Sequence, residues 1–396
     1  MNCNLVKRSS FQNTMMSKIL CFVMTLLSLN IYAQQRYVII SGQFSNTKPG
    51  TFLIIDRDSY FGKEPIRDSI CLHDDGHFED TLKTVHEATL ARFSISNEPA
   101  WQNTNIRSFL FPDYSLYMTG DVQKGLTNTL KYYNCGSIVN NYLLEREKRF
   151  TFDIEDFTII KPYNERQKPF MKENRRIQMY NLNYTQAVLL PEASFDDSVF
   201  RYYDRRKEYA RSYFMENIDP GDISIRYFDM MEKVDCRFSK ALVLLKYPTQ
   251  NALITHELEM PWSDINVHYY KQFEEKSLQP SDACLPIQNY RNYFVQYINL
   301  LSGDFVEIVN VNPKLASFTE RFKIALNTYE GKTRDLVLAS ILEDKFKDVI
   351  EYEDENNEAE KLVEEFRKIK PDVVILRQVE KLYTETLDKI NLKAHK

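Results

Sequence analysis

The chain has 396 residues, of which 43% are hydrophobic, and this is enough for two domains with cores of their own. Its 56 acidic and 51 basic residues give a formal net charge of −5, so no excess of positive charge favours binding to nucleic acid. Only 10 residues are glycine, which argues against dinucleotide- and phosphate-binding folds, where the backbone must approach the ligand closely.

The N-terminal segment has the pattern of a secretory signal peptide. An uncharged apolar run from Ile19 to Ala33 follows three basic residues and ends on a small side chain. The run is shorter than the ~20 apolar residues of a membrane-spanning helix. We therefore expect residues 1–33 to be removed, which predicts a periplasmic or otherwise extracytoplasmic protein with no transmembrane anchor after cleavage.

Residues 34–125 are predicted to form an antiparallel β-sandwich. Short runs rich in β-branched and aromatic residues recur there with turn residues between them. Asp74-Asp75-Gly76 predicts a hairpin, since Asp-Gly tolerates the positive φ of a tight turn. The expected strands are Tyr37 to Phe44, Thr51 to Ile55, Asp68 to Leu72, His77 to Leu82, Thr89 to Ile95, Ile106 to Phe111 and Ser115 to Thr119.

Residues 126–396 are predicted to form an α-helical domain, which makes the fold class α+β. Apolar side chains recur there at helical spacing, as expected for helices that each bury one face. Pro371 is expected at the start of the last helix. The first helix is expected from Ser137 to Phe150. The buried stripes of later helices are Val199, Tyr203, Ala210, Phe214 and Ile218; Leu338, Leu342, Phe346 and Val349; Leu362, Phe366 and Ile369; and Leu376, Val379, Tyr383, Leu387 and Ile390.

Four cysteines remain beyond the predicted leader, and none belongs to a CxxC pair. They are Cys71, Cys135, Cys236 and Cys284. An exported protein meets oxidising conditions, so disulfides are allowed, and four cysteines permit three pairings. Cys71 with Cys135 is the least remote pairing and is the possible disulfide. The favoured alternative is that all four are small buried thiols.

No motif in the sequence predicts a catalytic, metal or cofactor site. His73 and His77 flank the Asp74-Asp75-Gly76 turn, which we interpret as an exposed polar turn because neighbouring strand residues point to opposite faces. Gly331-Lys332-Thr333 lacks the earlier glycine of a phosphate loop, since Leu326 stands there, and is interpreted as a helix-ending glycine. The basic and aromatic stretch 201–207 is interpreted as helix packing and not as a nucleic-acid site.

Several short motifs occur in a fixed order along the chain. They are Ile40 to Phe44 (ISGQF), Asp75 to Phe78 (DGHF), Phe109 to Asp113 (FLFPD), Thr119 to Asp121 (TGD), Asn134 to Ser137 (NCGS), Asn141 to Leu143 (NYL) and the closing helix Val373 to Leu392. This order resembles the N-terminal region of the exported thioredoxin-like disulfide reductases (the TlpA/ResA group) of Gram-negative bacteria. In that group a β-domain and a helical segment precede the redox domain. Where the family usually has Pro-Gly-Asp, this chain has Pro-Asp.

The resemblance implies fold and compartment, but the activity of the family does not carry over. The chain ends at Lys396, where the family would begin its thioredoxin strands, and it has no CxxC pair. A dithiol reductase needs an activated thiolate with a resolving partner. We therefore expect an exported, non-catalytic binding or accessory module without a cofactor. Its partner would be an unknown periplasmic protein or small ligand, and not nucleic acid.

Two alternatives to this function stay open. The chain could be a truncated or split half of a thiol-disulfide oxidoreductase, because it stops after a family-like linking helix. It could also be an unrecognised hydrolase that depends on carboxylates. Asp and Glu are abundant, but only the fold can place a catalytic pair of them.

Overall fold

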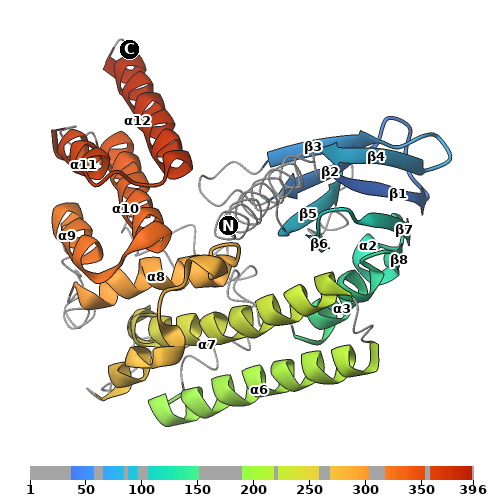
Figure 1. The fold of residues 1–396 in the computed structure, drawn as a ribbon, viewed down its shortest axis with the longest axis horizontal. Helices are drawn as coiled ribbons and strands as arrows, with labels where there is room; N and C mark the ends of the chain where they lie inside the picture. The colour runs from blue at the N-terminus through green and yellow to red at the C-terminus, as the bar shows by residue number, and fades with distance from the viewer. Residues whose placement is uncertain are drawn as a thin grey trace, which may run out of the picture. The chain divides into compact units, whose positions relative to one another are not determined.

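The computed structural model describes residues 37–57, 66–83, 88–96, 106–150, 190–217, 222–257, 268–302, 317–352 and 357–394. The chain divides into two compact units, Met1–Ile55 with Asp68–Ser137, and Asp56–Arg67 with Ile138–Lys396. We call them the strand unit and the helical unit. The strands form two four-stranded sheets, and a mainly helical region follows them, so the α+β class is confirmed (Figure 1). The predicted signal peptide, residues 1–33, lies outside the described residues.

The first sheet has the strand order β4-β1-β7-β8 and is mixed. Strand β1 (Tyr37–Ser45) pairs antiparallel with β4 (His77–Lys83) and parallel with β7 (Ser115–Asp121). Strand β7 pairs antiparallel with β8 (Lys131–Asn134). The expectation of a wholly antiparallel fold is therefore wrong at β1 and β7. Parallel neighbours cannot be joined by a tight hairpin, and the chain between these two strands passes through the second sheet.

The second sheet has the order β3-β2-β5-β6. Its strands are β2 (Phe52–Arg57), β3 (Ile66–Cys71), β5 (Thr89–Ile95) and β6 (Ile106–Leu110). All seven expected strands are present, with bounds that differ by at most two residues from those predicted. Strand β8 was not expected, because its four residues follow a short helix, α2 (Leu126–Thr129), and are too few to show an alternating pattern.

The Asp74-Asp75-Gly76 segment is a tight turn, but it does not connect paired strands. The Gly76 N–H donates to the His73 carbonyl at 2.8 Å, and the His73 N–H donates to the His77 carbonyl at 2.9 Å. Strands β3 and β4 nevertheless lie in different sheets, so the predicted hairpin is wrong. A tight turn can be predicted from the few residues that form it. The strand with which a given strand pairs depends on distant residues that share its buried face.

The first sheet buries one face. Along β1, buried Val38, Ile40 and Phe44 alternate with more exposed side chains, as the period of a strand requires. The Ser108 hydroxyl of β6 is hydrogen-bonded to the Tyr132 hydroxyl of β8. The buried faces of the two sheets therefore meet at this point.

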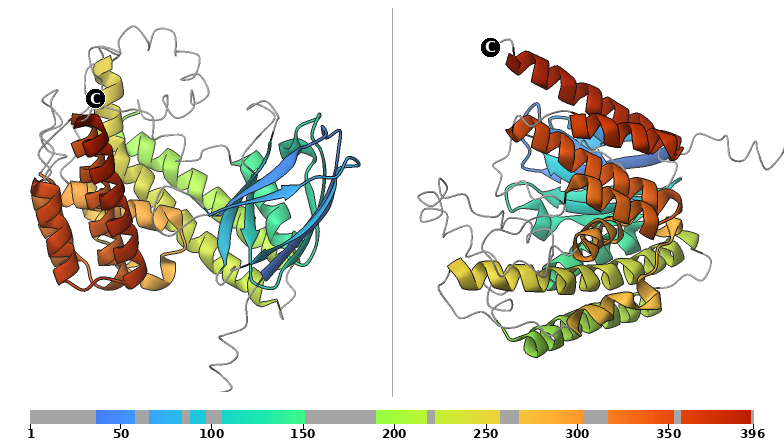
Figure 2. Two further views of the ribbon diagram at one scale, coloured as in Figure 1. Left: turned by 90° about the horizontal axis from the view of Figure 1, so that it is seen from above. Right: turned by 90° about the vertical axis from the view of Figure 1, so that its left-hand side faces the viewer.

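The helical unit begins with α3 (Ser137–Arg149) and continues into two long antiparallel helices, α6 (Glu192–Asn217) and α7 (Ile223–Glu257), which lie side by side (Figure 2). Short 3-10 turns at Tyr269–Glu274, Lys276–Leu278 and Asp282–Cys284 lead to α8 (Gln288–Leu301). The remaining helices are α9 (Phe318–Thr328), α10 (Gly331–Tyr352), α11 (Asn357–Lys368) and α12 (Val373–Ala394). In the part of the chain that the structure describes, no helix combines the length and apolarity needed to cross a membrane.

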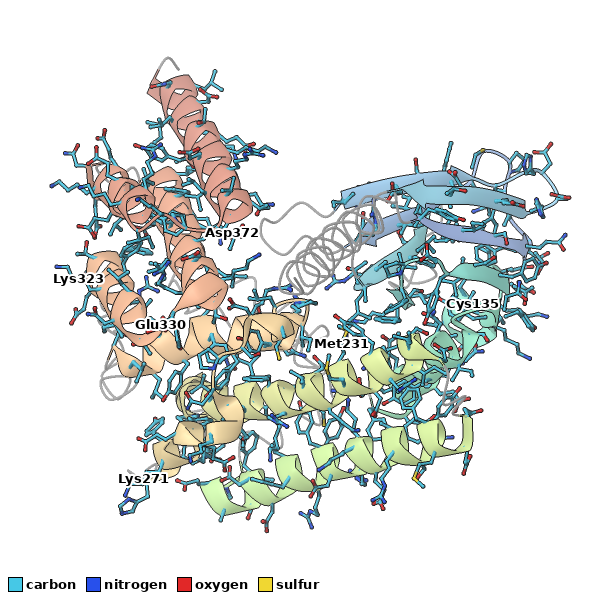
Figure 3. The ribbon with its side chains drawn as sticks, viewed as in Figure 1. Cys135, Met231, Lys271, Lys323, Glu330 and Asp372 are labelled. Carbon is cyan, nitrogen blue, oxygen red and sulfur yellow. The ribbon has the colours of Figure 1, made fainter. Side chains whose placement is uncertain are left out.

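Most of the predicted buried stripes are confirmed. The described members of the α6 stripe and all four members of the α10 stripe are buried; Ile218 lies outside the described residues. In α11 the expected Leu362 and Phe366 are buried, whereas Ile369 is half-buried. The α12 stripe is wrong at four of its five positions, because the buried face is centred on Ile375 and Val379, while Leu376, Tyr383, Leu387 and Ile390 are only half-buried. Lys332 and Asp372 form an ion pair at 3.1 Å near the start of α12, where Figure 3 labels Asp372.

The interpretation of Gly331 as a helix-ending residue is wrong. Helix α9 ends at Thr328, and Gly331 is the first residue of α10, with φ +61°. The Asp282 carboxylate, 50 residues earlier than Lys332, accepts hydrogen bonds from the N–H groups of Lys332 and Thr333 at 3.1 and 3.0 Å. A glycine with positive φ can lie at either end of a helix. The sequence around Gly331 does not show that Asp282 caps α10.

Gly76→Ala is expected to destabilise the protein more than Gly50→Ala. Both glycines have positive φ, which costs a residue with a side chain about 1–2 kcal/mol. A Cβ at position 76 would also lie 1.8 Å from the Phe44 carbonyl oxygen, whereas at position 50 it would meet open space. Urea denaturation of both variants measures the difference. Equal losses would contradict this packing.

Candidate functional site

The possible disulfide partners both lie on the surface of the strand unit. Cys71 ends β3, and Cys135, which Figure 3 labels, follows β8; both side chains are exposed. The expectation that all four cysteines are buried is therefore wrong for these two, because each lies where a strand ends. The structure does not test the pairing of Cys71 with Cys135, which stays a prediction.

The other two cysteines lie in the helical unit. Cys236 of α7 is buried, and its thiol donates to the Tyr203 carbonyl at 3.6 Å. Burial raises the pKa of this thiol to about 11. A thiol that stays protonated at neutral pH is a poor nucleophile. Cys284 is half-buried, and burial raises the pKa of its thiol as well.

The histidines beside the Asp-Gly turn do not form a metal centre with their neighbours. The rings of His73 and His77 are stacked, with centroids 6.1 Å apart. Among the described residues, no group of three or more His, Cys, Asp or Glu side chains is placed to hold a metal ion. Both histidines are exposed, as expected for a polar turn.

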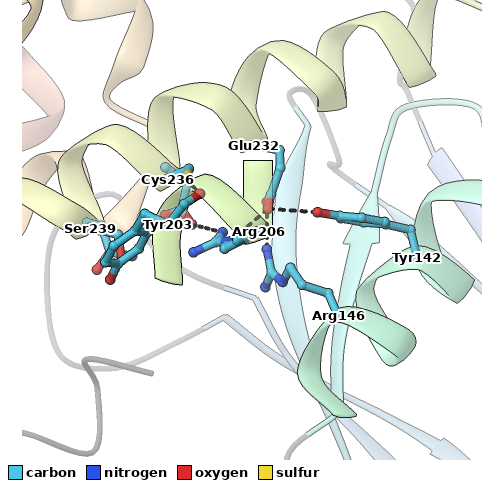
Figure 4. Close-up of polar contacts among 9 residues, drawn as sticks. Tyr142, Arg146, Tyr203, Arg206, Glu232, Cys236 and Ser239 are labelled. Atoms are coloured by element: carbon cyan, nitrogen blue, oxygen red, sulfur yellow. Dashed lines mark hydrogen bonds and ion pairs between the residues drawn. The ribbon is translucent and has the colours of Figure 1, made fainter. Parts of the chain in front are cut away.

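A group of charged side chains that bond to one another lies inside the helical unit (Figure 4). It joins α3, α6, α7 and α8. The side chains of Arg146, Arg206 and Glu232 are less than 10% exposed, and that of Asp235 is 22% exposed. We call it the buried charge network. Its members are Tyr142, Arg146, Arg206, Glu232, Asp235 and Asn289.

Glu232 is the centre of this network. Its carboxylate accepts hydrogen bonds from the Tyr142 hydroxyl at 2.9 Å, from Arg146 Nη1 at 2.6 Å and from Arg206 Nε at 2.9 Å. The Glu232 side chain is only 4% exposed, so these bonds form in an environment of low dielectric constant. Two arginines from different helices therefore neutralise a single carboxylate of α7.

Asp235 extends the network by one further turn of α7. It accepts hydrogen bonds from Arg206 Nη2 at 2.6 Å and from the Asn289 side-chain amide of α8 at 2.9 Å. The spacing of three residues between Glu232 and Asp235 places both on one face of α7, and the spacing of four between Tyr142 and Arg146 does the same on α3. Two carboxylates thus meet two guanidinium groups, and the formal charges balance.

The pKa shifts follow from burial and these contacts. Burial alone would raise the pKa of Glu232, but attraction to Arg146 and Arg206 outweighs burial and holds the pKa below its ordinary value. Burial likewise opposes ionisation of Asp235, and attraction to Arg206 and Arg146 again leaves its pKa lowered. Both carboxylates are therefore ionised at neutral pH. A general base that works near pH 7 needs a pKa close to that value, and neither group has one.

Aromatic rings enclose one side of the network. The Tyr142 ring lies 4.8 Å from Phe214, 5.6 Å from Tyr209 and 5.8 Å from Phe228, measured between ring centroids. Tyr142 is fully buried. This packing keeps water from the ion pairs, which strengthens them and also makes them costly to disrupt.

The apolar stripes in the sequence do not predict the network. One signal was present, since Arg206 lies three residues after Tyr203 on the stripe of α6 that was expected to be buried. The expected packing role of the stretch 201–207 is confirmed, because Tyr203 and Arg206 are both buried. Nothing in the sequence identifies Glu232 and Asp235 as the acids that face Arg206.

A second group with a shifted pKa lies near the start of α6. The Asp196 Oδ1 atom is buried, and no hydrogen bond to it is present in the structure. Burial raises the pKa of Asp196 to about 6, and repulsion from Glu192 and Asp197 adds to the shift. The nearby Tyr247 hydroxyl donates instead to the Leu190 carbonyl at 2.7 Å.

No protein-family model, no curated protein and no solved structure matches this chain. Its function has to be inferred from its own residues. In the described part of the chain, each charged member of the buried charge network bonds to a residue of another helix.

Glu232→Gln is expected to lower the free energy of unfolding by about 3–5 kcal/mol, because it leaves two buried arginines with one carboxylate between them. The matched control is Asp229→Asn, one turn earlier on α7. Asp229 pairs at 2.5 Å with Lys233, which is 58% exposed, and such a surface pair contributes about 0–1 kcal/mol. Chemical denaturation of the two variants gives the comparison.

The loss in Glu232→Gln should also depend on pH. A carboxyl with a lowered pKa stabilises the fold above its ordinary pKa of 4.5, and this stabilisation is lost as the pH falls through the folded-state value. The difference in unfolding free energy between wild type and Glu232→Gln should therefore be largest at pH 7 and decrease in strong acid. A gap independent of pH, or equal losses in the two variants, would contradict the network.

Asp196→Asn is expected to stabilise the protein at pH 7.5 and to have little effect at pH 4. A raised pKa means that ionisation of Asp196 weakens the fold progressively as the pH rises from about 4 to about 6. The gain at pH 7.5 is about 1 kcal/mol, because partial exposure reduces the linkage value. Thermal denaturation at both pH values measures it, with Asp204→Asn, a change at an exposed residue further along α6, as control. A gain at pH 4 as large as at pH 7.5 would contradict the assignment.

Proposed function

We propose that this chain is an exported, non-catalytic binding or accessory module, in which the helical unit is a rigid support and the strand unit carries the binding surface. The observation that supports the proposal is that the charged groups of the buried charge network bond to one another and to polar groups of the protein. Perturbed titratable groups often mark active sites, but structural ion-pair networks perturb pKa values as well. Here each carboxylate is met by guanidinium, hydroxyl or amide groups of other helices.

We infer further that the two sheets pack face to face as a β-sandwich. The alternating burial along β1 and β7 and the hydrogen bond between Ser108 and Tyr132 support this arrangement. In a sandwich the inner faces form the core and the outer faces remain available to ligands. The strand unit therefore offers a flat, stiff surface, unlike a mobile loop.

Export is supported by the signal-peptide pattern of residues 1–33 and by the resemblance to the N-terminal region of exported thioredoxin-like reductases. Both favour a periplasmic or otherwise extracytoplasmic protein. The partner would be another protein of that compartment or a small ligand.

Two measurements on the purified chain from residue 34 onward test this function. Thermal denaturation is followed with a panel of small ligands and with periplasmic extract fractions, and turnover is followed with chromogenic glycoside and ester substrates. We expect at least one ligand to raise Tm without turnover, since a ligand at 100 times its Kd stabilises a protein by about 2.7 kcal/mol. Turnover of any substrate by the pure protein would contradict a non-catalytic module. So would the absence of any stabilising ligand together with no specific partner in a pull-down.

A further inference from the structure

The outward face of the mixed sheet carries two neighbouring tyrosines. Tyr117 of β7 and Tyr133 of β8 are directly opposite each other in the strand register. The adjoining residues Met118 and Tyr132 are buried, so the alternation of the strands turns Tyr117 and Tyr133 outward. Their ring centroids lie 6.1 Å apart with the planes tilted by 56°, and Tyr133 is 44% exposed.

Polar side chains continue from these rings across the same face. Ser41 of β1 is opposite Tyr117, and Glu79 of β4 is opposite Ser41, so one row crosses all four strands. Neighbouring strands lie about 4.8 Å apart, which makes the row about 14 Å long. The parallel row two residues further along consists of Lys131, Thr119, Gln43 and His77. We call these eight side chains the tyrosine face.

Two side chains of the tyrosine face bond to the backbone of the strand unit. The Ser41 hydroxyl donates to the Leu116 carbonyl at 3.5 Å, and the Gln43 amide donates to the Asp75 carbonyl at 3.4 Å. Both side chains keep oxygen atoms that can accept further bonds. Glu79 and Lys131 are exposed and add a carboxylate acceptor and an ammonium donor.

The composition of this face distinguishes between classes of ligand. Glu79 and Lys131 balance in charge, so the face does not favour a polyanion. None of the eight side chains is aliphatic, whereas the centre of a protein interface is usually apolar. A sugar ring has C–H groups on its faces and hydroxyl groups around its rim. Tyrosine rings pack against such C–H groups, and the neighbouring hydroxyl, amide and carboxylate groups can bond to the rim.

We propose that the tyrosine face binds an uncharged glycan chain. This inference rests on the proposed function as a binding module and names the class of ligand. The two tilted rings contact successive sugar units along the chain, while Glu79 and Gln43 bond to their hydroxyl groups. Rigid tyrosines on paired strands lose little conformational freedom on binding, which favours affinity.

The test is affinity electrophoresis of the purified protein in gels that contain xylan, mannan or mixed-linkage β-glucan, followed by calorimetric titration with the matching oligosaccharide. Wild type is expected to be retarded by at least one of these neutral glycans. Tyr133→Ala should weaken binding at least tenfold and leave Tm almost unchanged, because the ring is exposed. The control is Phe52→Ala, which removes an aromatic ring of 40% exposure from β2 of the other sheet and should bind as wild type does.

Three results would overturn the glycan inference. They are no retardation by any neutral glycan, undiminished binding by Tyr133→Ala, and equal loss of binding in Tyr133→Ala and Phe52→Ala. If a protein or another small ligand stabilises the chain while no glycan binds, the proposed function as a binding module is supported and the glycan inference is contradicted. Turnover of a chromogenic substrate would instead remove the proposed function itself.

Discussion

The meeting of two arginines with Glu232 and Asp235 is the constraint on which the first part of the helical unit depends. Moving a charge out of water costs several kcal/mol, and only partners at short distance and in good geometry offset that cost. Helix α7 supplies both carboxylates, while the opposing groups come from α3, α6 and α8. The four helices must therefore dock together, since any one of them left out would leave a buried charge or dipole unsatisfied.

The two units differ in where their polar side chains lie. In the helical unit, Arg206, Glu232 and Asp235 have shifted pKa values and bond to one another. The strand unit is different, because aromatic and polar side chains stand together on the outward face of the mixed sheet.

The sequence predicts the local structure well, but it does not predict which distant residues contact one another. The seven expected strands and the α6 and α10 stripes follow from periods of 2 and 3.6 residues, which depend only on nearby side chains. The parallel pairing of β1 with β7, the separation of β3 from β4, and the Asp282 cap on α10 each join residues far apart in the chain. The same holds for the buried charge network. Arg206 on an apolar stripe indicates a buried ion pair, but it does not identify the acidic residue that pairs with it. The tyrosine face was hidden for a related reason, because β8 is too short to be recognised.

A double-mutant cycle between Arg146 and Glu232 tests most directly whether the buried charges serve to hold the helices together. The single changes Arg146→Met and Glu232→Gln, and the two combined, are compared by chemical denaturation. We predict that the double variant loses clearly less stability than the sum of the single losses, with a coupling energy of about 1–3 kcal/mol, because Arg146 bonds directly to the buried Glu232 carboxylate. Additive losses would contradict the account and show that the two side chains do not act as a buried ion pair.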